Sequence, residues 1–113
     1  ADYIVTQMFF NNDDFFTFES ECRNVGIEVP IIPGIKILGS VKQLKSIPKN
    51  FYVNIPTDLS DEVDENPDHT KEIGINWCFN QCEGLLNHGV QNIHFYIMSG
   101  ASGVTKVLKT LNN

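Results

Sequence analysis

Three short, nearly continuous apolar runs alternate with amphipathic stretches along this chain, and that alternation leaves few folds open. The runs cover residues 3–10, 27–32 and 93–97 and are rich in β-branched and aromatic residues. Strands that are apolar on both sides are typical of parallel sheets, because helices cover both faces of such sheets. Strands that alternate with helices pair in parallel through right-handed crossovers. The sequence therefore predicts an α/β fold with parallel strands and flanking helices.

The stretches between the runs have helical periodicity. Residues 11–14 offer an N-cap and first-turn acids to a helix that Gly26 closes, and Gly89 closes a second helix. The apolar stripe of the first helix consists of Phe15, Phe18, Cys22 and Val25. The stripe of the second consists of Ile75, Cys78, Phe79, Cys82, Leu85 and Leu86. A final helix is predicted from Val104, Val107, Leu108 and Leu111.

The section between these helices is the least regular. Pro33-Gly34 is expected to stop the second strand, and Pro30 weakens that strand because it cannot donate to a ladder. Short helices are predicted over residues 41–47 and from Thr57 onward. Asn66-Pro67 predicts an N-cap followed by proline at the first position of the long helix.

Three strand–helix units are too few to close a barrel. Three parallel strands leave two open edges, whereas a (β/α)₈ barrel has eight units and about 250 residues. This chain has 113 residues and begins at Ala1, without Met and close to an apolar run. We therefore expect a cut chain that is a slice of a barrel, or a small sheet that depends on something else.

Charge and composition exclude several classes of partner. The formal charge is −6, and residues 57–72 hold seven acids against one base. An acidic chain without a basic stripe is a poor candidate for nucleic acid or an anionic membrane. No apolar run approaches the ~18 residues of a membrane span. The acidic stretch is interpreted as a solvated helix face or loop; an acidic docking site is the alternative, and the spacing does not match a Ca²⁺ loop.

The cysteines indicate a reducing compartment. The chain has three cysteines, an odd number, at Cys22, Cys78 and Cys82, and their spacing does not match a disulfide framework. This predicts reduced thiols and a cytoplasmic protein. Cys78 and Cys82 share a helix face and could join His88 or His94 as zinc ligands. The stronger interpretation is that both act as small hydrophobic residues of the stripe. No metal site is predicted.

Polar residues in the strands are the main candidates for a site. Thr6 and Gln7 interrupt the first strand, and a buried amide must find hydrogen bonds in protein, water or a ligand. Ligands of barrels bind at the carboxyl ends of strands, toward which Gln7 lies. A structural Gln7 and a ligand-binding Gln7 both remain open at this point. His94 is interpreted as a hydrogen-bonded core residue rather than a general base.

The glycine-rich turns carry little functional signal. The turns at residues 33–40 and 99–103 match neither a P-loop nor a nucleophile elbow, so plain turns are predicted. No Ser/His/Asp set and no carboxylate pair stands out. No catalytic residue is predicted in this chain.

Three segments carry a family resemblance. Residues 4–10 contain T-Q-x-F-F, residues 22–35 contain G-I-x-V-P-I-I-P-G-I, and residues 94–96 read H-F-Y. In this order and spacing they resemble methylenetetrahydrofolate reductase. The resemblance runs through almost the whole chain but covers only the C-terminal part of the family's catalytic domain. It implies the last three βα units of a (β/α)₈ TIM barrel, with residues 35–66 as the excursion after the seventh strand.

The resemblance implies a function and a set of ligands. In the family, NADH or NADPH reduces FAD, and the flavin reduces 5,10-methylenetetrahydrofolate to 5-methyltetrahydrofolate for methionine synthesis. Gln7 matches a glutamine that hydrogen-bonds the pterin and can meet the nicotinamide, and Gln43 matches one that contacts folate further from the ring. The residues that grip FAD lie upstream of this chain, so the chain alone is not expected to be active. Folate, the rest of the barrel and further copies of the protein are the expected partners.

The chain also departs from the family pattern. Ile47 stands where many members have an aromatic that stacks on the substrate, and Gly100 replaces a basic residue that holds the folate carboxylates. Lys106 is a candidate substitute for that anchor. Asn11 and Ile37 replace a frequent Asp and Pro.

The sequence thus predicts that residues 1–113 form the C-terminal portion of one TIM-barrel catalytic domain of a bacterial-type enzyme. Two alternatives come from other classes. One is a stand-alone ligand-binding or regulatory α/β module, and the other is an inactive structural fragment of the enzyme.

Overall fold

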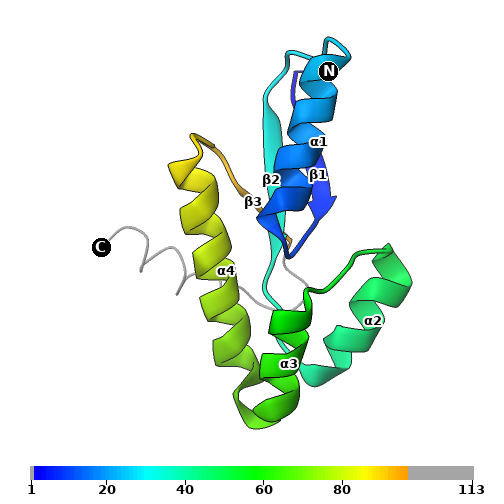
Figure 1. Cartoon of the computed structure of the whole chain (residues 1–113), viewed down its shortest axis with the longest axis vertical. Helices are drawn as coiled ribbons and strands as arrows, with labels where there is room; N and C mark the ends of the chain where they lie inside the picture. The colour runs from blue at the N-terminus through cyan, green and yellow to red at the C-terminus, as the bar shows by residue number, and fades with distance from the viewer. Residues whose placement is uncertain (1, 97–113) are drawn as a thin grey trace.

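A single parallel sheet organises the chain, of which the computed structural model describes residues 2–96. The strands lie in the order β1-β2-β3 (Figure 1), and they are β1 (Ile4–Met8), β2 (Ile31–Lys36) and β3 (His94–Tyr96). The helices are α1 (Asn12–Asn24), α2 (Val41–Phe51), α3 (Thr57–Glu65) and α4 (Thr70–Asn87), and a 3₁₀ helix, η1 (Pro67–His69), precedes α4. The predicted α/β class is confirmed. The final helix and the 99–103 turn lie outside the described residues.

Helices α1 and α4 pack against one face of the sheet. Asn11 caps α1, because its side chain accepts a hydrogen bond from the backbone N–H of Asp13 (2.9 Å), and Gly26 and Gly89 take positive φ just beyond the two helices. Part of each predicted stripe forms the core with the sheet. That core consists of Phe9, Phe15, Cys22, Ile31, Ile35, Cys78, Cys82 and Leu85.

The outer members of the two stripes are not buried as expected. Phe18 is 39% exposed, Val25 76% and Leu86 44%. At about 100° per residue, Phe18 and Val25 lie roughly 60–80° around α1 from Phe15, whereas Cys22 lies only about 20° away. Only one narrow line of the helix therefore meets the sheet.

The end of the second strand was predicted wrongly, because β2 runs through Pro33 and Gly34 to Lys36. The register explains why proline is tolerated there. Val5 pairs with Ile32 and Met8 with Gly34, so two residues of β1 oppose Pro33 alone. This is a β-bulge, where the ladder is interrupted and a missing N–H costs little.

The excursion after β2 forms a second core at the carboxyl ends of the strands. Figure 1 shows α2 and α3 beyond the ends of β1 and β2. Helix α2 begins at Val41 as predicted but continues past Pro48 to Phe51, and α3 begins at Thr57 as predicted. The acids of α3 are exposed, in agreement with a solvated face. The second core consists of Met8, Phe10, Leu38, Ile47, Val53, Leu59, Val63 and Ile73.

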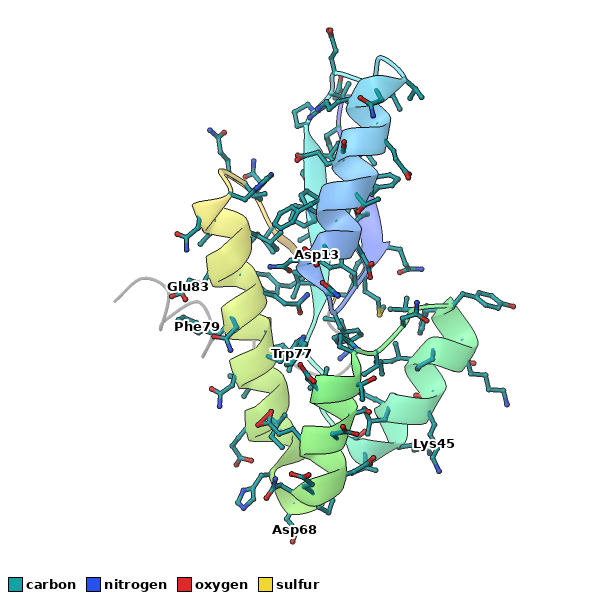
Figure 2. The ribbon with its side chains drawn as sticks, viewed as in Figure 1. Asp13, Lys45, Asp68, Trp77, Phe79 and Glu83 are labelled. Atoms are coloured by element: carbon teal, nitrogen blue, oxygen red, sulfur yellow. The ribbon has the colours of Figure 1, made fainter. Side chains whose placement is uncertain are left out.

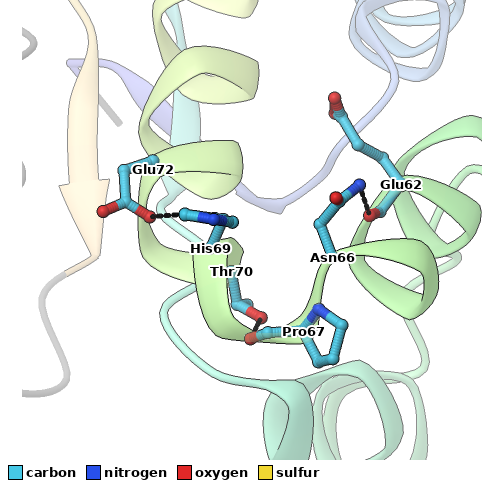
Figure 3. A network of polar contacts seen from close by, with 6 residues as sticks. All are labelled: Glu62, Asn66, Pro67, His69, Thr70 and Glu72. Carbon is cyan, nitrogen blue, oxygen red and sulfur yellow. Dashed lines mark hydrogen bonds and ion pairs between the residues drawn. The ribbon is translucent and has the colours of Figure 1, made fainter.

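The junction of α3 and α4 differs from the predicted cap. Pro67 starts η1 rather than α4, and the Asn66 amide donates backward to the carbonyl of Glu62 (3.3 Å) (Figure 3). Thr70, the first residue of α4, donates its hydroxyl to the carbonyl of Pro67 (2.7 Å). Asn66 therefore satisfies the end of α3 instead of the start of α4. Among the described residues, no helix is long and apolar enough to cross a membrane.

Candidate functional site

The bulge in β1 places two polar residues side by side at the carboxyl end of the sheet. Thr6 is buried, and its hydroxyl accepts the backbone N–H of Gly34 (2.9 Å) and donates to the carbonyl of Gln7 (3.0 Å). The side chain thus replaces the backbone acceptor that the bulge removes from the ladder. Tyr96 of β3 donates its hydroxyl to the carbonyl of Thr6 (2.8 Å). All three strands are thereby tied together beside Gln7.

Gly34 leaves room for this arrangement. A Cβ at residue 34 would lie 2.5 Å from the Tyr96 ring and 2.6 Å from the carbonyl oxygen of Thr6. The Tyr96 ring therefore packs directly on the backbone of β2. This packing fixes the strand ends from which Gln7 projects.

Gln7 is exposed, not buried as the sequence pattern implied. Its Oε1 accepts the backbone N–H of Met8 (2.9 Å), which orients the amide. The Nε2 group has no hydrogen-bond partner among residues 2–96, so both of its protons are free to donate to a ligand. Bulges of this kind re-aim side chains next to functional sites.

A pocket of about 430 Å³ opens beside Gln7, lined by β1, whose second side pairs with no strand among residues 2–96. Asp14 and Phe18 of α1 line one side, and residues 52–54 line the other. Tyr52 follows α2 in the left-handed conformation (φ 54°) and is 94% exposed. The pocket joins an amide, a carboxylate and two exposed aromatic rings beside β1, the edge strand of the sheet within the described residues.

Gln43 lies elsewhere. Its Oε1 accepts the backbone N–H of Gly39 (2.7 Å) and so closes the turn at the start of α2. Tyr52 follows nine residues later, which at 1.5 Å per residue separates it from Gln43 by about 13 Å along the helix. Gln43 does not line the Gln7 pocket, and Ile47 is 1% exposed within the second core.

His94 does not take the predicted core position. It is exposed on β3 and its ring meets the Tyr96 ring edge-on, with 4.7 Å between the centroids. β3 is an edge strand of the sheet within the described residues. No further strand among them covers the His94 side chain. Gly100 and Lys106 lie outside the described residues.

Lys36 is a candidate that the sequence pattern did not single out. It ends β2, is 7% exposed and donates to the carbonyl of Ile37 (2.6 Å). Burial lowers the pKa of Lys36. No ion pair to Lys36 is present among the described residues, and residues 97–113 contain no Asp or Glu. The sequence feature that could have identified Lys36 is a charged residue at the end of an otherwise apolar strand.

We predict that, in the 113-residue chain, Lys36→Met stabilises the fold by roughly 1 kcal/mol at pH 7, since a buried amine that meets no acid among the described residues loses hydration. The unfolded chain holds a proton at Lys36 more readily than the folded one. Stability of the wild type should therefore rise with pH toward the ordinary lysine value of 10.5. Urea unfolding at pH 7 and 10 measures this: the advantage of Lys36→Met should shrink at the higher pH. An advantage independent of pH, or a loss of stability, would contradict it.

The cysteines occupy the core as interpreted. Cys22, Cys78 and Cys82 are free and buried. A hydrogen bond with Cys82, together with burial, raises the pKa of the Cys78 thiol. The Cys78 thiol is therefore neutral, and a neutral buried thiol is a poor nucleophile and a poor metal ligand. The same hydrogen bond lowers the pKa of Cys82, and burial opposes that effect. Among residues 2–96, no three His, Cys, Asp or Glu side chains gather where they could hold a metal ion.

Comparison with known proteins identifies the family. The family model described as methylenetetrahydrofolate reductase matches residues 1–112. The chain belongs to the methylenetetrahydrofolate reductase family. It is 32% identical to "Probable methylenetetrahydrofolate reductase (NADPH)" of Caenorhabditis elegans and 31% identical to "Methylenetetrahydrofolate reductase (NADH) 1" of Arabidopsis thaliana. It is also 31% identical to "5,10-methylenetetrahydrofolate reductase" of Escherichia coli strain K12.

The alignments cover nearly all of this chain but a minor part of its relatives in the methylenetetrahydrofolate reductase family. Each of the three covers 98% of the chain. They cover 17% of the nematode protein, 19% of the plant protein and 38% of the bacterial one. The chain thus spans less than two fifths of these relatives.

Proposed function

We propose that this chain supplies the last three βα units of the (β/α)₈ catalytic domain of a methylenetetrahydrofolate reductase. The proposed reaction uses NADH or NADPH as electron donor and converts 5,10-methylenetetrahydrofolate to 5-methyltetrahydrofolate, which serves methionine synthesis. One observation carries the proposal. The family match spans the chain, while within residues 2–96 β1 pairs on one side only and carries an exposed amide, Gln7, toward its carboxyl end.

The open edge of β1 supports a longer barrel. One side of β1 pairs with β2, and the order β1-β2-β3 leaves the other side free among the described residues. Exposed Phe18 stands beside that edge. Unpaired strand edges flanked by apolar side chains are covered in stable proteins. A preceding βα unit would cover both the free side of β1 and the Phe18 side chain. The need for such cover disfavours a stand-alone module.

Gln7 is the residue that we propose to contact substrate. Its free Nε2 protons match acceptor atoms of a pterin or of a nicotinamide carboxamide, and its Oε1 is already oriented by Met8. Gln43 is proposed to contact folate further from the ring through its own free amide nitrogen. Because Ile47 is buried, stacking on the substrate would have to come from another ring, and Tyr52 is an exposed one at the Gln7 pocket.

FAD would have to be held by strands outside this chain. Within residues 2–96, Arg23 donates to the carbonyls of Ile27 and Val29 (both 2.8 Å), and Lys36 is buried. Neither group is free to hold a pyrophosphate. Exposed lysines remain on α2, namely Lys42, Lys45 and Lys49, so the assignment of FAD to other strands rests on the family resemblance. The proposed part of the described residues is to bind and orient the folate and the nicotinamide.

We also propose a cytoplasmic, homo-oligomeric protein. Three free, buried cysteines suit a reducing compartment. Open sheet edges and exposed apolar side chains favour association with other chains.

The test compares the full-length protein with the 113-residue chain. The full-length protein should bind FAD, lose flavin absorbance with NADH or NADPH in the absence of oxygen, and regain it when 5,10-methylenetetrahydrofolate is added. The 113-residue chain should bind no FAD. A full-length protein that lacks flavin or does not react with the folate would contradict the proposed function. Stoichiometric quenching of flavin fluorescence by the short chain would contradict the assignment of FAD to other strands.

A further inference from the structure

The three segments that carry the family resemblance meet at one point of the structure. Thr6 and Gln7 belong to the first segment, Gly34 to the second and Tyr96 to the third. The hydroxyl of Thr6 accepts the N–H of Gly34 (2.9 Å), and the hydroxyl of Tyr96 donates to the carbonyl of Thr6 (2.8 Å). Residues up to 90 positions apart are thereby brought together beside Gln7.

The interrupted ladder leaves Gln7 without a paired residue. The register pairs Val5 with Ile32 and Met8 with Gly34, and it gives neither Thr6 nor Gln7 a partner in β2. In a regular parallel pair, the ladder of hydrogen bonds orients each peptide group. Between Val5 and Met8, side chains have to supply this orientation.

Two hydroxyl groups hold the peptide groups on either side of Gln7. The carbonyl of Thr6 and the N–H of Gln7 lie in one planar peptide group, which the Tyr96 hydroxyl binds. The carbonyl of Gln7 and the N–H of Met8 lie in the next, which the Thr6 hydroxyl binds (3.0 Å). The dihedral angles of Gln7 are the rotations between these two planes. Hydroxyl groups therefore fix them, and one of the two comes from β3.

The second peptide group decides which end of the Gln7 amide is free. The N–H of Met8 donates to Oε1 of Gln7 (2.9 Å). If the oxygen and nitrogen of the amide exchanged places, two donors would face each other. Gln7 therefore offers donors to a ligand only while the peptide group between Gln7 and Met8 keeps its orientation.

The chain is also anchored just beyond Gln7, by side chains of α4. Trp77, which Figure 2 labels on α4, donates its Nε1 to the carbonyl of Phe10 (2.7 Å). Gln81 donates its Nε2 to the carbonyl of Phe9 (3.1 Å). These bonds hold the segment after β1, whereas the Tyr96 bond holds the peptide group of Gln7 itself.

We propose that Tyr96 is a positioning residue for Gln7, whose amide it holds with the Nε2 donors free to meet a ligand. Tyr96 does not line the Gln7 pocket, so it acts through the peptide group of Gln7. Its effect on the reaction rests on the proposed function, in which Gln7 contacts substrate. Its effect on the Gln7 amide does not.

The first test measures hydrogen exchange in the full-length protein, labelled with ¹⁵N at methionine and isoleucine. Tyr96→Phe keeps the ring that packs on Gly34 and removes the hydroxyl. It should speed exchange of the Met8 amide about 3- to 10-fold, the range for one hydrogen bond. The amide of Ile35, which is 0% exposed in the central strand, reports global opening and should change less than about twofold.

Two further variants support this measurement. Met8→Leu assigns the Met8 resonance. Tyr3→Phe is the matched control, because it removes a hydroxyl from a tyrosine that is 58% exposed just before β1. It should leave the exchange of both amides unchanged.

The second test compares Tyr96→Phe in two backgrounds of the full-length protein. In the wild type it should slow flavin reoxidation by 5,10-methylenetetrahydrofolate about 2- to 10-fold, with full flavin content. In Gln7→Ala it should slow the reaction less than about 1.5-fold, because the group that it positions is gone. A merely structural role would slow both backgrounds alike.

The outcomes separate this proposal from the proposed function. Unchanged Met8 exchange in Tyr96→Phe overturns it, as does equal slowing in the two backgrounds. A Tyr96→Phe protein that does not fold, or in which Met8 and Ile35 exchange rise together, also overturns it, since the hydroxyl would then support the whole sheet. A wild type that does not react with the folate contradicts the proposed function, and Met8 exchange then decides the role of Tyr96 alone.

Discussion

Gly74→Ala is expected to destabilise the native fold severely. Gly74 is buried in α4, where a Cβ would overlap the carbonyl oxygen of Leu38 and lie 2.9 Å from its carbonyl carbon. These are backbone atoms of the segment that leads from β2 into α2, and no side-chain rotation relieves them. Helix α4 would have to move away from both cores. We expect a loss of more than about 3 kcal/mol, a large share of a typical stability of 5–15 kcal/mol.

Gly84→Ala is the matched control for this change. It lies in the same helix, and there a Cβ meets only Nδ2 of Asn12, the mobile end of a side chain, at 2.9 Å. The gain in helix propensity, about 1 kcal/mol, should offset the displaced hydrogen bond of Asn12. Urea unfolding of the two variants measures the difference. Similar midpoints for both would mean that α4 does not pack on Leu38 as closely as described.

Elements that depend on local pattern could be predicted from the sequence. Helix α1 begins at its capping Asn11, and the glycines that follow α1 and α4 take positive φ. The core positions Phe15, Cys22 and Cys78 follow from helical periodicity. These features depend on residues a few positions apart, which is why a single sequence contains them.

Features that depend on distant partners could not be predicted. Pro33-Gly34 has the composition of a turn, yet it continues β2 because the bulge in β1, 27 residues earlier at Thr6, faces it. The prediction at Asn66 failed for a different, local reason: its side chain can cap the start of the next helix or bond backward, and it bonds to the carbonyl of Glu62, four residues earlier. Composition alone does not decide between these two local bonds.

The candidate site residues also divide into one that could be selected from the sequence and one that could not. Gln7 was selected by family resemblance, and the structure adds that its amide is exposed at a bulge. Lys36 was missed because its significance lies in its surroundings: it is buried, and no acid side chain pairs with it among the described residues. A sequence shows a polar residue but not whether its partners are present.

Gln7→Ala in the full-length protein should leave FAD bound and slow the reaction with folate. The variant removes the free Nε2 donors at the pocket and the acceptor for the Met8 N–H. Loss of one or two substrate hydrogen bonds, at roughly 0.5–1.5 kcal/mol each, lowers the efficiency of the folate half-reaction about 2- to 150-fold. The nicotinamide half-reaction should fall as well if both ligands use the same wall. Circular dichroism and flavin absorbance check that fold and cofactor are retained.

The central claim is that Gln7 belongs to the wall of the folate pocket, and stopped-flow absorbance tests it most directly. Reduced full-length wild type, Gln7→Ala and Thr17→Ala are mixed with 5,10-methylenetetrahydrofolate, and flavin reoxidation is followed in each. Thr17 is an exposed residue of α1 outside the Gln7 pocket and serves as the control. The account predicts slow reoxidation in Gln7→Ala alone, with full flavin content in all three proteins. Wild-type rates for Gln7→Ala in both half-reactions would reduce Gln7 to a structural residue and contradict the claim.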